Sequence, residues 1–406
     1  MRNKKDKLTR KERKAIRRAK RIERARHGGP IARMALRIVT EYDYLIVLYV
    51  TILVVFGVIM VFSAGYYSTV NAAKPDPYYY LKRQGFFAVI GFILMTVTAQ
   101  FDYHRYKALA IPLAVTGFIL LLLLMTPLGI SVNFATRWIA IGPIRITPSE
   151  ICKLTVIIFT SVFLAANPMR VRRFSGVTFL LVFAGVHAAL IIWQPNLSTA
   201  IVIMAIAVGI MFIAGLSLGY IGALFAVGAG GTLLILTKLQ HTHWYSRLTN
   251  WIDPFADSQG AGYQVSQSII ALGNGGIFGR GLGNSVAKNL YLPEPQNDFI
   301  LAIIGEELGF VGFFLLMCLY LLLVWECIRV AGRVKDKLGL YLASGIAIML
   351  ALQVIINVAV VTASMPATGI TLPFISYGGT SLWIFMIAMG IMLNISKVQN
   401  MRSMEK

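Results

Sequence analysis

The sequence predicts an all-α integral membrane protein with about ten transmembrane helices and both termini in the cytoplasm. Hydrophobic residues make up 57% of the 406 residues, charged residues make up only 14%, and the mean hydropathy is +0.71. Soluble globular domains are about half apolar and about a quarter charged. The composition therefore indicates a membrane protein, and the apolar runs and the distribution of Lys and Arg give its topology.

Ten apolar runs define the predicted spans. A helix of about 20 apolar residues crosses a bilayer, and irregular backbone cannot face lipid. Two connections are long, 127–148 and 238–297, and loops of that size are usually functional or disordered. The runs, of which the second and last are short, cover residues 44–64, 85–100, 108–126, 149–166, 174–193, 197–215, 218–237, 299–325, 339–362 and 380–396.

Positive charges orient these spans, because cytoplasmic loops carry an excess of Lys and Arg. With a cytoplasmic N-terminus, 28 of the 38 Lys and Arg lie inside, sixteen of them in residues 1–43. Both long connections are then extracytoplasmic, and the larger one, 238–297, joins spans seven and eight. We interpret 44–396 as one membrane domain and 397–406 as a cytoplasmic tail.

The basic segment 1–43 is interpreted as a disordered cytoplasmic tail that contacts anionic membrane lipids. A nucleic-acid patch is the alternative for such a charge run, and nothing else in the chain suits nucleic acid. Cysteines give no disulfide or metal framework, because all three fall in predicted spans without a CxxC pair. His241 and His243 are either two metal ligands or, as we prefer, a chance pair in a wet loop.

The first candidate site lies where the 127–148 connection enters the fourth span. Residues 147–150, TPSE, have the form of a capping box with Pro in the first turn, so a helix begins here. Glu150 and Lys153 share a face of that helix. They form either a cap with a neutralising ion pair or a preorganised polar site. Arg137 and Arg145 add positive charge that suits an anionic ligand.

The second candidate site lies in the larger loop. The stretch GYQVSQSIIALG (262–273) predicts a short amphipathic helix at the membrane interface. A glycine-dense stretch follows, whose backbone can approach a ligand closely. It contains GRGLG, a weak nucleotide-binding pattern that no strand precedes. Arg247, Arg280 and Lys288 flank it, and a basic, glycine-rich external loop suits a diphosphate attached to a lipid.

The third candidate site is LPEPQNDFILAIIGEELG (292–309). Asp298 is expected in the first turn of span eight, where a carboxylate is either a charge cap or a group for proton transfer. Glu306 and Glu307 lie about 12 Å deeper, where charges face a cavity or a partner. We interpret them as structural and paired with Arg or Lys.

Two glycines and a second loop complete the pattern at this end of the chain. Gly305 and Gly309, four apart, allow another helix to approach closely. Residues 366–382, PATGITLPFISYGGTSL, predict irregular backbone that is buried in protein or lines a cavity. Gln353 and Asn357 lie four apart on span nine, where they are placed to hydrogen-bond to this segment.

Together these segments resemble the SEDS family (shape, elongation, division and sporulation), the FtsW/RodA/SpoVE group of bacterial cell-wall proteins. The resemblance covers nearly the whole chain after about residue 40, and the LPEP and SYGGTSL forms are closer to the division and sporulation branch. The matching stretches are RWI and PSEICK (137–153), QPNLSTA (194–200), GYQVSQSIIALGNGG (262–276), GLGNS (281–285), LPEPQNDFI with GEELGF (292–310) and ATGITLPFISYGGTSL (367–382).

The resemblance implies a peptidoglycan glycosyltransferase that polymerises lipid II outside the bacterial cytoplasmic membrane during division or sporulation. It implies Asp298 as the catalytic residue and Glu150 with Lys153 as polar site residues. It also implies as partners lipid II, a class B penicillin-binding protein and other division proteins. The candidate cofactor is a divalent cation, Mg²⁺ or Mn²⁺, without an evident ligand set and without an organic cofactor. The further substrate-binding candidates in or near the matching motifs are Arg137, Arg247, Gln264, Ser268, Arg280, Lys288, Ser376, Tyr377 and Gly378.

The chain departs from the family pattern at three positions. The family usually has Asp where this chain has Asn196, Gly where it has Ser198, and Gln where it has Thr147. Because an amide cannot act as a base, the departure at Asn196 shifts weight to Asp298. The implied reaction has Asp298 take the proton of a sugar 4-hydroxyl, with inversion at the donor carbon.

Two other functions are kept as alternatives. A lipid II transporter would place polar groups along a path from one side of the membrane to the other. A non-catalytic scaffold for a partner transpeptidase would leave Asp298 dispensable. The polar and glycine-rich motifs cluster at the predicted external end, which favours chemistry there.

Overall fold

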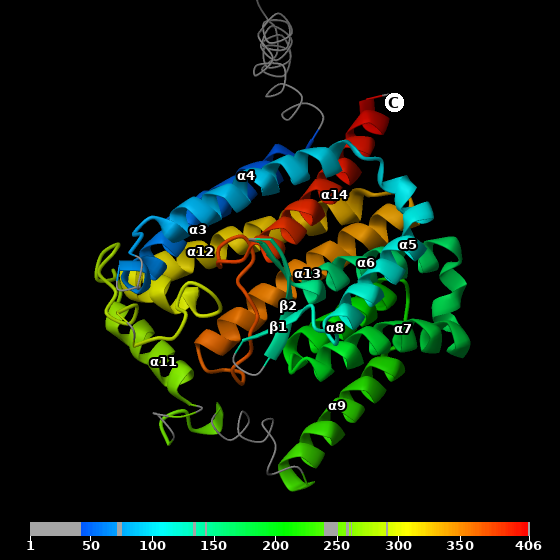
Figure 1. Cartoon of the computed structure of the whole chain (residues 1–406). Coiled ribbons are helices and arrows are strands. Elements are labelled where there is room, and N and C mark those ends of the chain that lie inside the picture. The colour runs from blue at the N-terminus through cyan, green and yellow to red at the C-terminus, as the bar shows by residue number, and fades with distance from the viewer. Residues whose placement is uncertain are drawn as a thin grey trace, which may run out of the picture.

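The computed structural model describes residues 42–70, 75–132, 135–142, 144–238, 251–256, 260, 262–289 and 291–404, and they form a bundle of long helices (Figure 1). Within this described part, eight helices are long and apolar enough to cross a membrane, and two apolar helices are shorter. A helix lies at each predicted run, while the number that cross stays a prediction. The tail 1–41 lies outside the described residues, as do Arg247, His241 and His243.

The long helices follow the apolar runs, and several extend beyond them. The helix α12 continues well past the predicted end at 325, and its final turns carry Glu326 and Arg329, which form an ion pair. The helix α14 continues into the predicted tail 397–406. The bounds are α3 Tyr44–Val70, α4 Tyr79–Gln100, α5 Tyr106–Leu123, α6 Pro148–Ala166, α7 Phe174–Trp193, α8 Leu197–Ile213, α9 Leu218–Lys238, α11 Tyr263–Gly275, α12 Ile300–Arg333, α13 Lys337–Val361 and α14 Gly379–Met404, with the 3-10 helices η1 Tyr103–Arg105 and η2 Pro168–Arg172.

Burial separates a central layer of helices from a peripheral one. In the most apolar stretch of each helix, 83% of residues are buried in α14 and 67% in α13, but only 22% in α12. The helix α9 leans away from the rest of the bundle, and its residues 225–231 are exposed (Figure 1). In a membrane protein such exposed apolar side chains face lipid, so the central helices α13 and α14 hold the protein core.

The 127–148 connection contains a small antiparallel sheet, which the sequence analysis did not predict. Its strands are β1 Gly129–Val132, β2 Ala135–Ile141 and β3 Ile144–Ile146, in the order β1-β2-β3. Ile139 pairs with Gly129 on one side and with Ile146 on the other. Gly142 has φ +61°, which suits the tight turn between β2 and β3. The sheet carries Arg137 and Arg145.

The helix α12 is interrupted at Gly309, whose φ of 66° and ψ of −170° are not helical. The glycine-rich segment after α11 fills the interruption with backbone hydrogen bonds. It accepts from the N–H groups of Phe310 (2.9 Å) and Val311 (3.1 Å) and donates to the carbonyls of Glu306 and Glu307, both at 3.0 Å. These four hydrogen bonds satisfy backbone groups that the interruption of α12 frees.

The glycines of this segment serve contact between chain segments. A Cβ at Gly279 would lie 2.2 Å from the Glu307 carbonyl oxygen, and one at Gly275 would lie 2.0 Å from that of Gly305. The predicted close approach at Gly305 and Gly309 is therefore confirmed, with α11 and the segment after it as the approaching elements. The sequence predicted that these glycines approach a ligand, whereas in the structure they pack against α12.

Candidate active site

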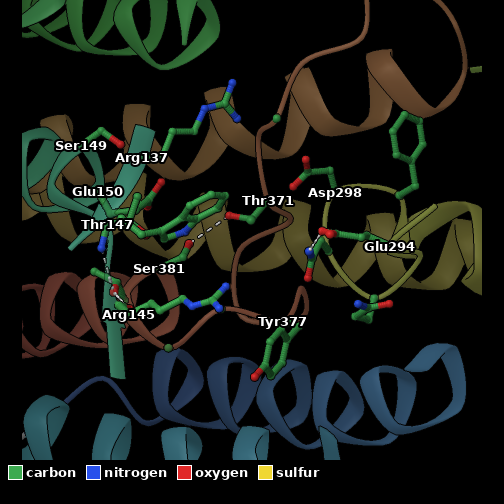
Figure 2. A pocket seen from close by; sticks show the side chains of 18 of the residues that line it. Arg137, Arg145, Thr147, Ser149, Glu150, Glu294, Asp298, Thr371, Tyr377 and Ser381 are labelled. Atoms are coloured by element: carbon green, nitrogen blue, oxygen red, sulfur yellow. Dashed lines mark hydrogen bonds between the residues drawn. The ribbon is translucent and has the colours of Figure 1, made fainter. Parts of the chain in front are cut away.

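A polar cavity of about 530 Å³ lies at the end of the bundle where five helices begin (Figure 2). Its wall includes a residue from the first turn or the N-cap of each: Tyr79 of α4, Glu150 of α6, Asn196 of α8, Phe299 of α12 and Gly379 of α14. Helix N-termini carry partial positive charge and unpaired N–H groups. The cavity therefore favours a ligand with negative charge.

Asp298 lies half-buried in the cavity wall, two residues before α12 begins. The sequence analysis expected it in the first helical turn, but the N-cap residue is Phe299 and no side chain caps this helix. Its backbone carbonyl instead accepts a hydrogen bond from Asn357 Nδ2 at 2.8 Å. This anchor holds the backbone while the carboxylate faces the cavity (Figure 2).

Arg137 reaches the same region from β2. Its Nη2 donates to the Pro195 carbonyl at 2.7 Å. Burial lowers the pKa of the Arg137 guanidinium, and the carboxylate of Asp298 raises it in turn. A Cβ at Gly369 would lie 2.7 Å from Arg137 Nη1 and 3.5 Å from Asp298 Oδ2. Gly369 therefore lies against both charged groups, and a side chain there would require the Arg137 guanidinium to move.

Two further arginines, Arg83 of α4 and Arg145 of β3, line the cavity. Arg83 donates to the Tyr79 hydroxyl at 2.6 Å. The sequence analysis noted Arg145 but missed Arg83, because it began the second span at residue 85. The signal was the Lys-Arg pair at 82–83, which stands at the predicted external end of that span.

Glu150 and Lys153 form the ion pair that their spacing predicts, at 2.7 Å. Lys153 is almost fully buried, and its Nζ also donates to Gln353 Oε1 at 2.5 Å. The helix begins at Pro148 as expected, but the predicted capping-box hydrogen bonds are absent from this helix start. Thr147 N–H instead donates to Thr380 Oγ1 at 3.2 Å, and Glu150 turns to Lys153.

The loop between α13 and α14 lines the cavity, which is one of the two settings that the sequence predicted for it. Asn357 Nδ2 donates to the Ile370 carbonyl at 2.8 Å, and Gln353 Nε2 donates to the Thr371 carbonyl at 3.4 Å. The predicted hydrogen bonding of Gln353 and Asn357 to this segment is therefore confirmed. The Tyr377 N–H donates to the Gln296 carbonyl at 2.9 Å, which ties the loop to the segment that carries Asp298.

The structure brings some predicted site residues together and separates others. Ser268 donates to the Val361 carbonyl and Ser376 accepts from Leu372 N–H, each at 2.8 Å and each inside the protein. Among the described residues, neither of these serines lines the cavity, and neither do Lys153, Arg280 and Lys288. Those that do line it are Arg137, Glu150, Gln264, Asp298, Tyr377 and Gly378.

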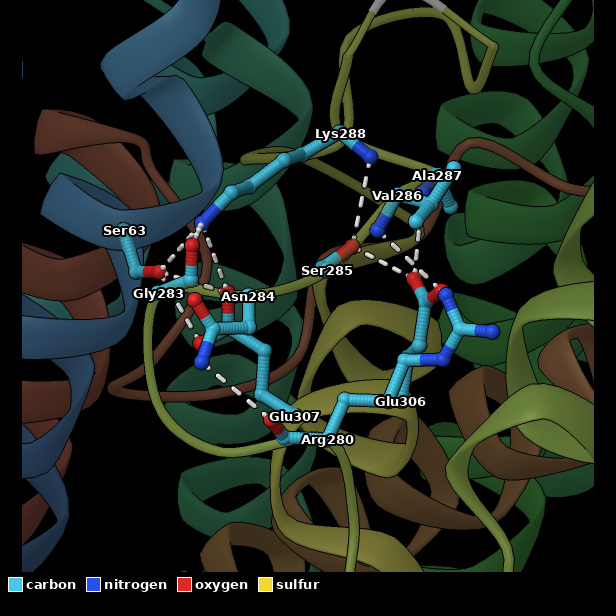
Figure 3. Close-up of polar contacts among 10 residues, drawn as sticks. All are labelled: Ser63, Arg280, Gly283, Asn284, Ser285, Val286, Ala287, Lys288, Glu306 and Glu307. Atoms are coloured by element: carbon cyan, nitrogen blue, oxygen red, sulfur yellow. Dashed lines mark hydrogen bonds and ion pairs between the residues drawn. The ribbon is translucent and has the colours of Figure 1, made fainter.

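Arg280 and Lys288 belong to a second polar cluster, around Glu306 and Glu307 (Figure 3). Lys288 Nζ lies 2.9 Å from Glu307 Oε1, and Ser63 of α3 donates to both oxygens of Glu307. Arg280 lies 3.6 Å from Glu306. The predicted pairing of both glutamates with Arg or Lys is confirmed, and both acids are fully buried.

The donor set does not fit a resident metal ion. No group of three or more His, Cys, Asp or Glu in the described residues is arranged to hold one. The charges nearest Asp298 include the guanidinium of Arg137, which would repel a cation. The cavity therefore supplies its positive charge through arginines and helix N-termini.

The fold and the cavity define a class: a multi-pass membrane protein with an acid in an arginine-lined cavity at one end of its bundle. The chain belongs to the FtsW/RodA/SpoVE family, whose profile, described as "Cell cycle protein", matches residues 43–401. The predicted membership of the SEDS family is thereby confirmed.

Two relatives illustrate this membership. The chain is 41% identical over 366 residues to the "Probable peptidoglycan glycosyltransferase FtsW" of Geobacter sp. (strain M18), covering 89% of this chain and 98% of that protein. It is 39% identical over 363 residues to "Stage V sporulation protein E" of Bacillus subtilis (strain 168), covering 88% and 98%. These names agree with the division and sporulation branch.

Solved structures agree as well. The rod shape determining protein RodA of Thermus thermophilus matches with a TM-score of 0.65 at 25% identity, covering 88% of this chain and 97% of that one. A chain from "Structural coordination of polymerization and crosslinking by a peptidoglycan synthase complex" matches with a TM-score of 0.71 at 26% identity, covering 88% and 98%.

Proposed function

We propose that this chain is a peptidoglycan glycosyltransferase that polymerises lipid II, with Asp298 as the general base. The observation that carries the proposal is one cavity that is lined by Asp298 and three arginines. Five helices begin at this cavity. The names of the relatives support the same activity. Lipid II, a disaccharide on a lipid diphosphate, presents both the hydroxyl and the anionic leaving group that such a cavity suits.

We place the cavity on the extracytoplasmic side of the cytoplasmic membrane. The Lys and Arg distribution puts the N-terminus inside, and alternation of the spans then puts the starts of α4, α6, α8, α12 and α14 outside. All five starts meet at the cavity. A substrate displayed on the outer leaflet therefore reaches Asp298 without crossing the bilayer.

The reaction is a displacement at the anomeric carbon of the donor. Asp298 takes the proton of the acceptor sugar's 4-hydroxyl while that oxygen forms a bond to the donor carbon. The bond from this carbon to the diphosphate oxygen breaks, and the diphosphate leaves with the electron pair, inverting the carbon. General base help of this kind contributes about 10²–10⁴-fold to a rate.

The leaving diphosphate gathers negative charge, and the arginines of the cavity are placed to stabilise it. Arg145 and Arg83 reach the cavity from β3 and α4. Lys153 lies beneath Glu150, and its charge is balanced by that partner. We propose that this buried pair shapes the cavity floor. The hydrogen bond from Lys153 to Gln353 links that floor to α13.

A divalent cation, Mg²⁺ or Mn²⁺, is proposed only as a counter-ion that arrives with the diphosphate. Mg²⁺ commonly binds through one or two carboxylates together with substrate phosphates. Glu150 and Asp298 line the cavity singly and do not form a three-ligand group. No step of the proposed reaction passes through the metal.

A partner is proposed from the structural relative. That chain comes from a peptidoglycan synthase complex that coordinates polymerisation with crosslinking. We propose that this chain likewise works with a class B penicillin-binding protein, which supplies the transpeptidase, and with other division proteins.

The test is polymerisation by the full chain with its partner transpeptidase, supplied with lipid II and Mg²⁺. We expect glycan strands from the wild type and a loss of about 10²–10⁴-fold in rate for Asp298→Asn. Asp76→Asn is the matched control, because Asp76 is an exposed acid on the same side that pairs with Lys82 and does not line the cavity. Full activity of Asp298→Asn would show that Asp298 is not the general base. A wild type that makes no polymer but moves lipid II across the membrane of vesicles would favour a transporter.

A further inference from the structure

The cavity wall beside Asp298 carries side-chain oxygens that the described protein leaves without partners. Twelve buried side-chain nitrogens and oxygens in the described residues lack a hydrogen-bond partner, and five of them belong to residues that line this cavity. They are the oxygens Gln296 Oε1, Asn297 Oδ1, Thr368 Oγ1 and Glu150 Oε2 and the nitrogen Arg137 Nε. Buried polar groups in proteins are normally hydrogen-bonded, so this concentration points to a ligand that supplies the missing partners.

The orientation of the Asn297 amide is set by its other contact. Asn297 Nδ2 donates to Glu294 Oε2 at 2.6 Å, and a carboxylate only accepts hydrogen bonds. The Asn297 amide nitrogen must therefore face Glu294, which leaves its oxygen as the open acceptor. Gln296 Nε2 donates to the Tyr80 hydroxyl at 2.9 Å, and this side chain is 5% exposed. At Asn297 the ligand has to be a donor.

The opposite wall carries a cation beside an acid. Figure 2 shows Arg145 and Glu150 on one side of the cavity, and Asp298 and Glu294 on the other. Arg145 is a cation that suits the charged end of a ligand, and its guanidinium points into the space between the walls. A ligand that spans the cavity therefore meets the Asn297 oxygen at one end and the Arg145 guanidinium at the other.

We propose that Gln296 and Asn297 form the subsite for the acceptor sugar. Their open oxygens accept hydrogen bonds from hydroxyl or acetamido N–H groups of the N-acetylated sugar whose 4-hydroxyl Asp298 deprotonates. The proposal rests on the proposed function, and it adds where each substrate lies. In a displacement with inversion the nucleophile and the leaving group stand on opposite sides of the reacting carbon, so the donor diphosphate lies toward Arg145.

The test combines variants with altered substrates. Gln296→Met and Asn297→Ala are measured with lipid II and with two analogues, one lacking the 3-hydroxyl of its N-acetylglucosamine and one with the acetamido nitrogen methylated. Each variant should raise KM roughly two- to tenfold and leave kcat within about twofold. For at least one analogue, the increase in KM for the variant with the analogue should be smaller than the product of the two separate increases. The reason is that the variant and the analogue remove the same hydrogen bond.

Inhibition by undecaprenyl diphosphate separates the two walls. Arg145→Gln should weaken this inhibition roughly tenfold, while Gln296→Met and Asn297→Ala should leave it unchanged. The proposed subsite would be overturned if both amide variants kept the wild-type KM. It would also be overturned if the KM increases of variant and analogue multiplied fully for both analogues. An inactive wild type would instead overturn the proposed function. Thermal unfolding is followed for each variant, and if Gln296→Met fails to fold, the half-buried Asn297→Ala decides.

Discussion

Two acidic regions lie within ten residues of each other and differ in how completely they are hydrogen-bonded. Around Glu306 and Glu307 every carboxylate oxygen has a partner; the Glu306 oxygens accept from Ser285 Oγ at 2.5 Å and from the N–H groups of Val286 and Ala287, both at 3.1 Å. Around Asp298 the wall keeps several unpartnered polar atoms and opens to a cavity.

The difference teaches that burial does not by itself mark a functional acid. Glu306 and Glu307 are the more deeply buried, yet their carboxylates form ion pairs and hydrogen bonds that hold α3, α12 and the segment 280–288 together. A fully satisfied polar network makes the structure rigid, whereas an open one is available to a ligand. The half-buried Asp298 lies in the wall that carries the unpartnered atoms.

The largest expected effect that tests this comparison is at Asp298. Asp298→Asn should lower the polymerisation rate about 10²–10⁴-fold and leave the melting temperature within about 2 °C. The amide keeps the shape of the side chain, and the backbone carbonyl still accepts from Asn357. Rate assays and thermal unfolding in detergent check both parts. A melting temperature that falls together with the rate would assign Asp298 to architecture.

Lys288→Met should have the opposite profile. It leaves Glu307 buried without its cation, and breaking such a pair costs about 3–5 kcal/mol of unfolding free energy. Thermal unfolding should show this loss as a lower melting temperature. Lys288→Met with Glu307→Leu should recover much of it, because an apolar pair of similar volume is often as stable. A stable but inactive Lys288→Met would instead connect this cluster to catalysis.

Gly309 tests the interruption of α12 that places the second cluster. Gly309→Ala should cost about 2 kcal/mol or more, because φ of +66° strains a residue with a Cβ. That Cβ would also lie 2.2 Å from the backbone nitrogen of Gly279. Gly332→Ala is the matched control in the same helix, since nothing lies within 4 Å of its Cβ position. The control should be neutral or stabilising by up to about 1 kcal/mol.

Much of the fold could be predicted from the sequence because the bilayer imposes long apolar helices. The break at Gly309 could not, since its evidence is a contact with Gly279, and a glycine in an apolar run also suits an unbroken helix. The sheet at 129–146 was missed for another reason. Its strands are only three to seven residues long, and the turn signal at Gly142 was available but was interpreted as a loop.

Site residues could be predicted where the neighbouring sequence showed that a charged residue stands at the end of an apolar run. Asp298 and Glu150 stand at span entrances in a chain with few acids, and both line the cavity. Arg280 and Lys288 were assigned to a ligand on charge alone, although the acids that pair with them were in view. Gln296 and Asn297 gave no signal, because their open oxygens become evident only when separate loops meet.

The smallest effect is expected at Asn196. It tests whether the contrast between hydrogen-bonded and unpartnered polar atoms also holds inside the cavity. This residue lines the cavity, but its Oδ1 is already used, since it accepts from Thr199 N–H at 3.3 Å and caps α8. Asn196→Asp keeps that acceptor at a helix N-terminus, so stability and rate should stay within about 0.5 kcal/mol and twofold. Asn196→Ala should cost about 1 kcal/mol in unfolding free energy through loss of the cap. A rate that rises tenfold in Asn196→Asp would show that a carboxylate here adds to catalysis, and that a satisfied oxygen in this wall is still open to substrate.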